Sequence, residues 1–159
     1  MTTIRQFSCD DFFKYNPVEL SDQPRSLVFN SLNVYHKHLL DAPEYCLVAE
    51  SPTGHMMGYI LADIEYTGSE FAVESHSYIS LLVTSQNYRN IGVASYLMTA
   101  FESISKHKRL CYIDLHVQVS NIVAIALYHK LNFGVYQTLN DYYWSELDQR
   151  AYLMRKYLL

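Results

Sequence analysis

The chain has 159 residues, of which 50% are hydrophobic and 14% aromatic, with 15 tyrosines. This length suits one domain, residues 1–159, and the apolar content excludes intrinsic disorder. The net charge of -4 comes without a long run of Lys or Arg, which excludes direct nucleic-acid binding. The cysteines are scattered and no stretch is apolar enough to span a bilayer, so we expect free thiols, no membrane partner and a cytoplasmic location.

The first part of the chain is predicted to hold a strand and two helices. Residues 3–7 favour a strand, and Ser8 with Asp11 resembles a capping box for a helix that Pro17 ends. After a polar loop, apolar residues at helical spacing predict a second helix, which Pro43 ends: Val28, Leu32, Tyr35 and Leu39. The apolar side of this helix is a candidate docking face, although packing in the core is the simpler interpretation.

The rest of the chain alternates strands and helices. Strands 45–50 and 56–65 are predicted to form a hairpin, because the turn between them contains proline and glycine. Residues 67–75 are expected to form a loop. The elements predicted after it are strand 78–84, a helix from residue 91, strand 112–117, helix 121–131, and strands 135–139 and 151–158. This order predicts a mixed α/β sheet.

A glycine-bearing turn follows the strand 78–84. It reads Arg89-x-x-Gly92-x-Ala94 and opens an amphipathic helix. Backbone N–H groups at such a turn are unpaired and point one way, which suits a phosphate. Gly92 would let the backbone approach a pyrophosphate, and Ala94 would keep the helix close to its neighbours. The alternative is a tight strand-helix turn with a solvated Arg89.

Asn121 and Tyr128 are seven residues apart, which places them on one face of a helix. Asn121 is a typical N-cap, with Asn132 as a left-handed terminator at the other end. Tyr128 either packs as a half-buried aromatic or donates a proton to a departing thiolate, since a phenol is protonated near pH 7.

Two of the seven histidines are well placed for a functional role. His76 precedes the central strand, and His116 shares a strand face with Asp114. Each is equally well explained as structural. Asp114 and His116 lack a third ligand at suitable spacing, so no metal is expected, and no Gly-x-Ser-x-Gly turn supports a serine nucleophile.

These residues resemble the GNAT superfamily of acetyl-CoA-dependent N-acetyltransferases, whose central motif is Arg/Gln-x-x-Gly-x-Gly/Ala after a strand. Within that superfamily the chain is similar to N-terminal acetyltransferases of the NatB type over nearly its whole length. The resemblance is carried by residues 1–5, 9–11, 43–45, 57–60, 88–98, 114–121, 128, 135–136, 142–143 and 151–156.

The resemblance implies a mixed, mostly antiparallel central sheet flanked by helices, with strands 78–84 and 112–117 splayed apart to admit the pantetheine arm of acetyl-CoA. Tyr128 would protonate the thiolate, and a water held by His76, Tyr142 or a carbonyl would take up the proton of the amine. The residues implied to contact acetyl-CoA are Leu82, Val83, Arg89, Asn90, Ile91, Gly92, Val93, Ala94, Asn121 and Tyr128.

The implied substrate is a nascent chain that begins Met-Asp, Met-Glu, Met-Asn or Met-Gln, whose α-amine attacks the thioester directly. A large helical-repeat auxiliary subunit would be the partner, and through it the ribosome. The chain departs from the family in the loop 20–30, at Tyr78 and at Ser80. The expected peptide contacts are Tyr78, Ser80, Tyr142, Tyr143 and, as a hypothesis, Arg25.

Two alternatives remain open. One is a GNAT enzyme of other specificity, which acts on Met-hydrophobic N-termini or on a small amine. The other is a catalytically silent subunit that binds acyl-CoA.

Overall fold

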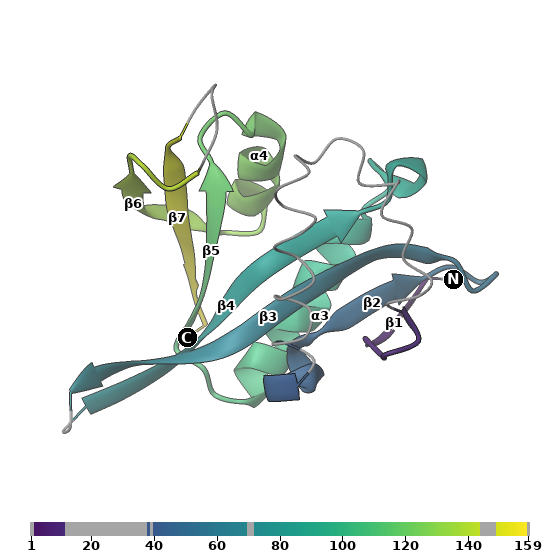
Figure 1. The fold of residues 1–159 in the computed structure, drawn as a ribbon, viewed down its shortest axis with the longest axis horizontal. Helices are drawn as coiled ribbons and strands as arrows, with labels where there is room; N and C mark the ends of the chain where they lie inside the picture. Colours follow the sequence, from purple (N-terminus) through teal and green to yellow (C-terminus); the bar gives the residue numbers. More distant parts are fainter. Residues whose placement is uncertain (1, 12–37, 39, 70–71, 144–148, 159) are drawn as a thin grey trace. The chain divides into compact units, whose positions relative to one another are not determined.

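A computed structural model of the chain describes residues 2–11, 38, 40–69, 72–143 and 149–158. Its strands pair in the order β1-β2-β3-β4-β5-β7-β6 (Figure 1). β4 and β5 are parallel, whereas the pairs β1–β2, β2–β3, β5–β7 and β6–β7 are antiparallel. The predicted mixed, mostly antiparallel sheet flanked by helices is therefore confirmed.

The chain divides into two compact units. One comprises Met1–Asp63 and Ser80–Ile104, and the other comprises Ile64–Ile79 and Ser105–Leu159. The long strands β3 (Met56–Ser69) and β4 (Ala72–Thr84) each contribute residues to both units.

The first unit contains β1 (Thr3–Gln6), the short 3₁₀ helix η2 (Pro43–Tyr45), β2 (Leu47–Glu50) and most of α3 (Val93–His107). Figure 1 shows α3 behind β2 and β3. The helix buries Leu97 and Phe101, and the Phe101 ring meets the Tyr45 ring edge-on at 6.2 Å. The core of this unit also includes Phe7, Cys46, Val48, Tyr59 and Leu61.

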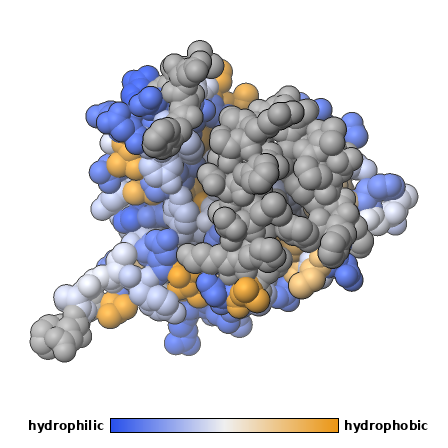
Figure 2. Space-filling view, viewed as in Figure 1, coloured by the Kyte–Doolittle hydropathy of each residue, from blue (hydrophilic) through white to orange (hydrophobic). Residues whose placement is uncertain are grey.

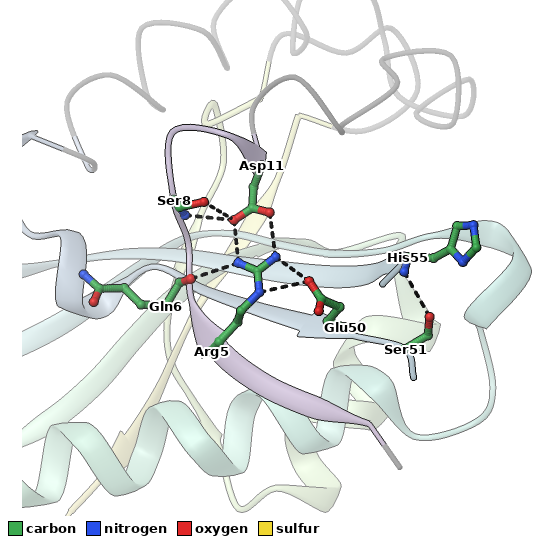
Figure 3. A network of polar contacts seen from close by, with 7 residues as sticks. All are labelled: Arg5, Gln6, Ser8, Asp11, Glu50, Ser51 and His55. Carbon is green, nitrogen blue, oxygen red and sulfur yellow. Dashed lines mark hydrogen bonds and ion pairs between the residues drawn. The ribbon is translucent and has the colours of Figure 1, made fainter. Parts of the chain in front are cut away.

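A partly buried ion-pair network fixes the start of the chain to β2 (Figure 3). The guanidinium of Arg5 donates to both carboxylate oxygens of Asp11 at 2.6 Å and to Glu50 at 2.6 Å. The amide of Ser8 also donates to Asp11, at 2.9 Å. Burial by itself raises the pKa of Asp11, but the hydrogen bonds from Arg5 and Ser8 outweigh it and lower that pKa to about 2. The bond from Ser8 is one half of the predicted capping box.

The second unit contains the start of β4, then β5 (Tyr112–Gln118), α4 (Ile122–Lys130), β6 (Gly134–Leu139) and β7 (Ala151–Tyr157). Ile113, Leu115 and Met154 are buried in its core. The apolar helix α4 leaves Ile122 and Val123 about three-quarters exposed, and hydrophobic residues gather where α4 lies in the space-filling view (Figure 2).

A cation–aromatic cluster holds β5 to β7. Arg155 donates two hydrogen bonds of 2.7 Å to the buried carboxylate of Asp114, its partner in the strand register. Its guanidinium carbon lies 3.6 Å from the centre of the Tyr112 ring and 3.9 Å from that of Tyr136. On the face of β5 opposite its apolar residues, the buried carboxylate of Asp114 is thus neutralised by its ion pair with Arg155.

One predicted loop is wrong. Residues 67–75 lie largely in strands, because β3 continues to Ser69 and β4 begins at Ala72. Contacts distant in sequence support them: the Thr67 hydroxyl is 3.3 Å from that of Tyr112, and Cys111 donates its amide to the Ser75 carbonyl at 2.8 Å. Tertiary pairing, which polar composition does not reveal, overrides the local preference.

Several smaller predictions are confirmed or adjusted. Residues 43–45 form η2 with Pro43 at its start, so β2 begins later than expected, at Leu47. Asn132 has the predicted left-handed backbone, with φ of 66°. The two N-terminal helices and Arg25 lie outside the described residues. None of the described helices is long and apolar enough to cross a membrane.

Candidate active site

The turn between β4 and α3 has the backbone geometry of an anion site. After the 3₁₀ helix η3 (Gln86–Tyr88), Asn90 and Gly92 adopt positive φ, 62° and 89°. Both are exposed, and a Cβ on Gly92 would meet no atom within 4 Å. The first helical bond runs from the Tyr96 amide to the Gly92 carbonyl at 3.0 Å, so the preceding amides have no partner inside the helix.

The other residues of the first unit that are predicted to contact the cofactor lie just before, within or just after this turn. Leu82 and Val83 are half-buried on β4, and Arg89 and Ile91 are exposed. Val93 is buried, so its side chain serves the core and only its backbone is available to a ligand. The phosphate-binding role of all these residues stays a prediction.

Asn121 and Tyr128 frame α4 in the second unit. The Asn121 side chain caps the helix by accepting the Ala124 amide at 3.1 Å, as predicted. Tyr128 is 8% exposed, and its carbonyl accepts the Phe133 amide at 2.9 Å. Burial raises the pKa of Tyr128 to about 12. The phenol is therefore protonated at neutral pH, as proton donation requires.

The second unit joins Tyr78, His116 and Tyr142 in one polar aromatic cluster. The Tyr78 hydroxyl is 2.8 Å from Nδ1 of His116 and 3.3 Å from the Tyr142 hydroxyl. The Tyr142 ring stacks on the His116 ring, with centroids 4.2 Å apart. The register brings the first two residues near one another, because Tyr78 pairs with Asp114 and Ile79 with Leu115.

Burial sets the protonation of this cluster. It lowers the pKa of His116, against smaller opposing effects of Asp114 and Glu65, so the imidazole is neutral at neutral pH. Burial, assisted by the hydrogen bond with Tyr142, raises the pKa of Tyr78 far above that of an ordinary phenol. The Tyr78 hydroxyl can donate to His116 Nδ1 when the neutral imidazole carries its proton on Nε2. A phenol bonded to a neutral imidazole can pass its proton on as it accepts another.

The segment after β6 holds Tyr142 and Tyr143, the other two tyrosines predicted to contact the peptide. The amides of Tyr142 and Tyr143 both donate to the Gln149 carbonyl at 2.9 Å, and the two rings meet edge-on at 4.9 Å. Burial raises the pKa of Tyr143 to about 12, with smaller contributions from Tyr142 and Tyr128. The predicted peptide contacts Tyr78, Tyr142 and Tyr143 thus lie in one cluster.

His76 has different surroundings from His116. It is 3% exposed, its ring stacks on Tyr112 at 4.4 Å, and its Nε2 is 3.3 Å from a Glu65 oxygen. This position gives His76 a packing role, and its catalytic role stays a prediction. Ser80 is half-buried on β4. Within the described ranges, no group of three or more His, Cys, Asp and Glu side chains could hold a metal ion.

The sequence marked His116 as well placed for a functional role but did not assign it to the site. Strand alternation places His116 on one face with Asp114, but it does not reveal that Tyr78 of a neighbouring strand lies within hydrogen-bond distance. The parallel register of β4 and β5 supplies this information.

The parallel ladder is short. Its three register positions end at Ile79 and Leu115, although β4 continues to Thr84 and β5 to Gln118. The splaying of these two strands stays a prediction.

Comparison with known proteins identifies the family. Residues 2–133 match the model of the acetyltransferase (GNAT) family. The chain is 36% identical to the N-terminal acetyltransferase B complex catalytic subunit NAA20 of Arabidopsis thaliana, over 98% of this chain and 87% of that protein. It is 35% identical to N-alpha-acetyltransferase 20 of Dictyostelium discoideum, over 99% of this chain and 87% of that one. The chain therefore belongs to the GNAT acetyltransferase family.

Solved structures agree. A chain of the NatB acetyltransferase complex bound to CoA and MES superposes with a TM-score of 0.80 at 30% identity, covering 99% of both chains. Naa20 of Chaetomium thermophilum, in complex with a bisubstrate analogue, also gives a TM-score of 0.80, at 25% identity, covering 98% of this chain and 86% of that one.

Proposed function

We propose that this chain is an acetyl-CoA-dependent N-terminal acetyltransferase of the NatB type. It transfers acetyl to the α-amine of protein N-termini that begin Met-Asp, Met-Glu, Met-Asn or Met-Gln. The observation that carries the proposal is the similarity to NatB catalytic subunits over 98% of the chain. We take residues 1–159 as a single catalytic domain.

Acetyl-CoA, when bound, supplies the acetyl group as a thioester. The turn that includes Asn90 and Gly92 would hold the coenzyme pyrophosphate. The exposed residues Asn90 and Gly92, their positive φ values and the amides that have no partner inside α3 fit such a group. Leu82 and Val83 on β4 and Asn121 at the start of α4 would make the further contacts.

Tyr78 and His116 would act together as the general base. An α-amine with a pKa of about 7.7–8.0 is partly neutral at physiological pH, so it needs a base only as it attacks. Its proton would pass to the Tyr78 oxygen while the Tyr78 proton passes to Nδ1 of His116 along the 2.8 Å hydrogen bond. A water held by His76, Tyr142 or a carbonyl is the alternative base, although the buried stacking of His76 on Tyr112 favours a structural role for that histidine.

Tyr128 would be the general acid. With a pKa raised to about 12 by burial, its phenol keeps its proton until the departing sulfur requires one. Tyr128 lies in the same unit as Tyr78, Tyr142 and Tyr143, which we propose as peptide contacts. Ser80 and Arg25 complete that proposed set.

The proposed partners follow from the same similarity. The Arabidopsis relative is the catalytic subunit of a complex, and one of the similar structures is that of the NatB complex. We propose that this chain also works with a large helical-repeat auxiliary subunit in the cytoplasm, and through it at the ribosome.

A peptide panel tests the function. The full chain, alone and with its auxiliary subunit, is incubated with labelled acetyl-CoA and peptides that differ only at the second residue. Acetylation of Met-Asp, Met-Glu, Met-Asn and Met-Gln peptides above Met-Leu supports the proposal. Preference for Met-Leu or for a small amine would place the enzyme in another GNAT class. Binding of acetyl-CoA without transfer in any combination would make the chain a silent subunit.

A further inference from the structure

Gly58 lies where three segments of the first unit meet. It is buried in β3, where Ala49 of β2 is its register partner. A Cβ on Gly58 would lie 2.6 Å from the Val83 carbonyl oxygen, 3.3 Å from the Thr84 Cα and 3.2 Å from Cγ1 of Val93. Val83 and Thr84 end β4, and Val93 begins α3. Only a residue without a side chain lets all three approach this closely.

The residues on either side of the turn 85–92 therefore both pack against Gly58. Residues 85–92 connect Thr84 to Val93 and include the two positive-φ residues Asn90 and Gly92. A backbone bond fixes one end further, because Ser85 donates its amide to the carbonyl of Met57, the neighbour of Gly58, at 2.9 Å. The separation of the two ends is thus set by how closely β3 lets them approach.

We infer that Gly58 is a positioning residue for the coenzyme diphosphate: it sets the geometry of the turn 85–92 without touching the ligand. The inference rests on the proposed function. The 2.6 Å contact would be with a backbone carbonyl, so rotating a side chain cannot relieve it and the end of β4 must move. That movement displaces one end of the turn relative to the other, and the amides lose their common direction.

The test compares two acetyl donors that differ in the diphosphate. The kcat/KM of the full chain with its auxiliary subunit is measured with acetyl-CoA and with S-acetylpantetheine, which lacks the nucleotide and diphosphate. Gly58→Ala is expected to reduce the preference for acetyl-CoA by about tenfold or more, while kcat/KM for S-acetylpantetheine changes by less than about twofold. Calorimetric titration with CoA should show a matching loss of affinity.

Gly134→Ala is the matched control. Gly134 lies in a strand of the other unit, and a Cβ there would meet no atom within 4 Å, so this variant should keep the preference of the wild type. If Gly58→Ala does not fold, the same comparison is made on Val93→Ile, which adds one methyl group at the same junction. It must show the same selective loss.

An unchanged donor preference in the folded variant would overturn the inference, and so would an equal loss with both donors, because a general packing defect does not distinguish them. A wild type that fails to transfer acetyl from acetyl-CoA would instead contradict the proposed function.

Discussion

The hydroxyl of Tyr78 and Nδ1 of His116 are 2.8 Å apart, on the two parallel strands β4 and β5. Tyr78 lies one position before their ladder ends, and His116 lies one position beyond it. Burial disfavours both the tyrosinate and the imidazolium, so the resting pair is a neutral phenol bonded to a neutral imidazole. When such a pair takes up a proton, the phenol stays neutral and the charge forms on the imidazole, so no free tyrosinate is needed.

Removal of His116 should change the pH dependence of the reaction. The pKa of His116 lies below its ordinary value of 6.5, so its basic form is present above that pH and is lost as pH falls through the lowered pKa. The peptide amine must also be neutral. At pH values below both pKa values, log kcat/KM of the wild type should fall with a slope of two. For His116→Gln the slope should be one, with a rate loss of about 10²–10⁴-fold at neutral pH.

The paired variant tests whether the two residues act as a unit. Tyr78→Phe should cost about as much as His116→Gln, and the double variant should lose little more than either single one. Fully additive losses of kcat/KM would contradict the proton relay from Tyr78 to His116. An unchanged slope of log kcat/KM against pH in His116→Gln would contradict it too.

Tyr128→Phe should lower turnover by about 10²–10⁴-fold with little change in CoA affinity, because the ring remains and only the proton donor is lost. Single-turnover rates and calorimetry with CoA separate the two effects. Equal losses of turnover and of affinity would instead make Tyr128 a packing residue.

Two glycines with the same backbone allow a matched test of the anion turn. Gly92 and Gly54 have φ of 89° and 80°, and a Cβ on either would meet no atom within 4 Å. Each alanine variant should lose about 1–2 kcal/mol of unfolding free energy from left-handed strain. Only Gly92→Ala should also weaken CoA binding, since Gly54 lies in the turn between β2 and β3. Similar CoA affinities in the two variants would contradict the proposal that the turn containing Gly92 binds the coenzyme.

The ion-pair network at the start of the chain should support stability in a defined pH range. Because the pKa of Asp11 falls from 3.8 to about 2 on folding, Asp11 contributes about 2 kcal/mol above pH 4, which is lost as pH falls toward 2. Urea unfolding of Asp11→Asn should therefore differ from the wild type at pH 7 and converge with it at low pH. Asp10→Asn, at an exposed neighbour, should behave as the wild type. A pH-independent difference would contradict this role for Asp11.

Local patterns predicted much of the fold. Caps are properties of short segments, so the N-cap Asn121 and the left-handed Asn132 were predictable from residue type and position. The loop at 67–75 was wrong because polar, β-tolerant residues become strand only when a partner strand is present.

The site was predictable only in part, for the same reason. A glycine turn and an Asn-Tyr helix face can be read along the chain. The Tyr78–His116 bond depends on the register of two strands separated by a helix, and the constraint at Gly58 depends on the approach of two other elements. These are tertiary facts, which composition and spacing do not contain.

The most direct test of the central claim is a crystal structure of the chain, with its auxiliary subunit, bound to CoA. The account predicts the diphosphate within hydrogen-bond distance of the backbone amides between Ile91 and Ala94, with the sulfur near the Tyr128 hydroxyl. A diphosphate bound elsewhere, or a turn that remains empty at saturating CoA, would contradict it.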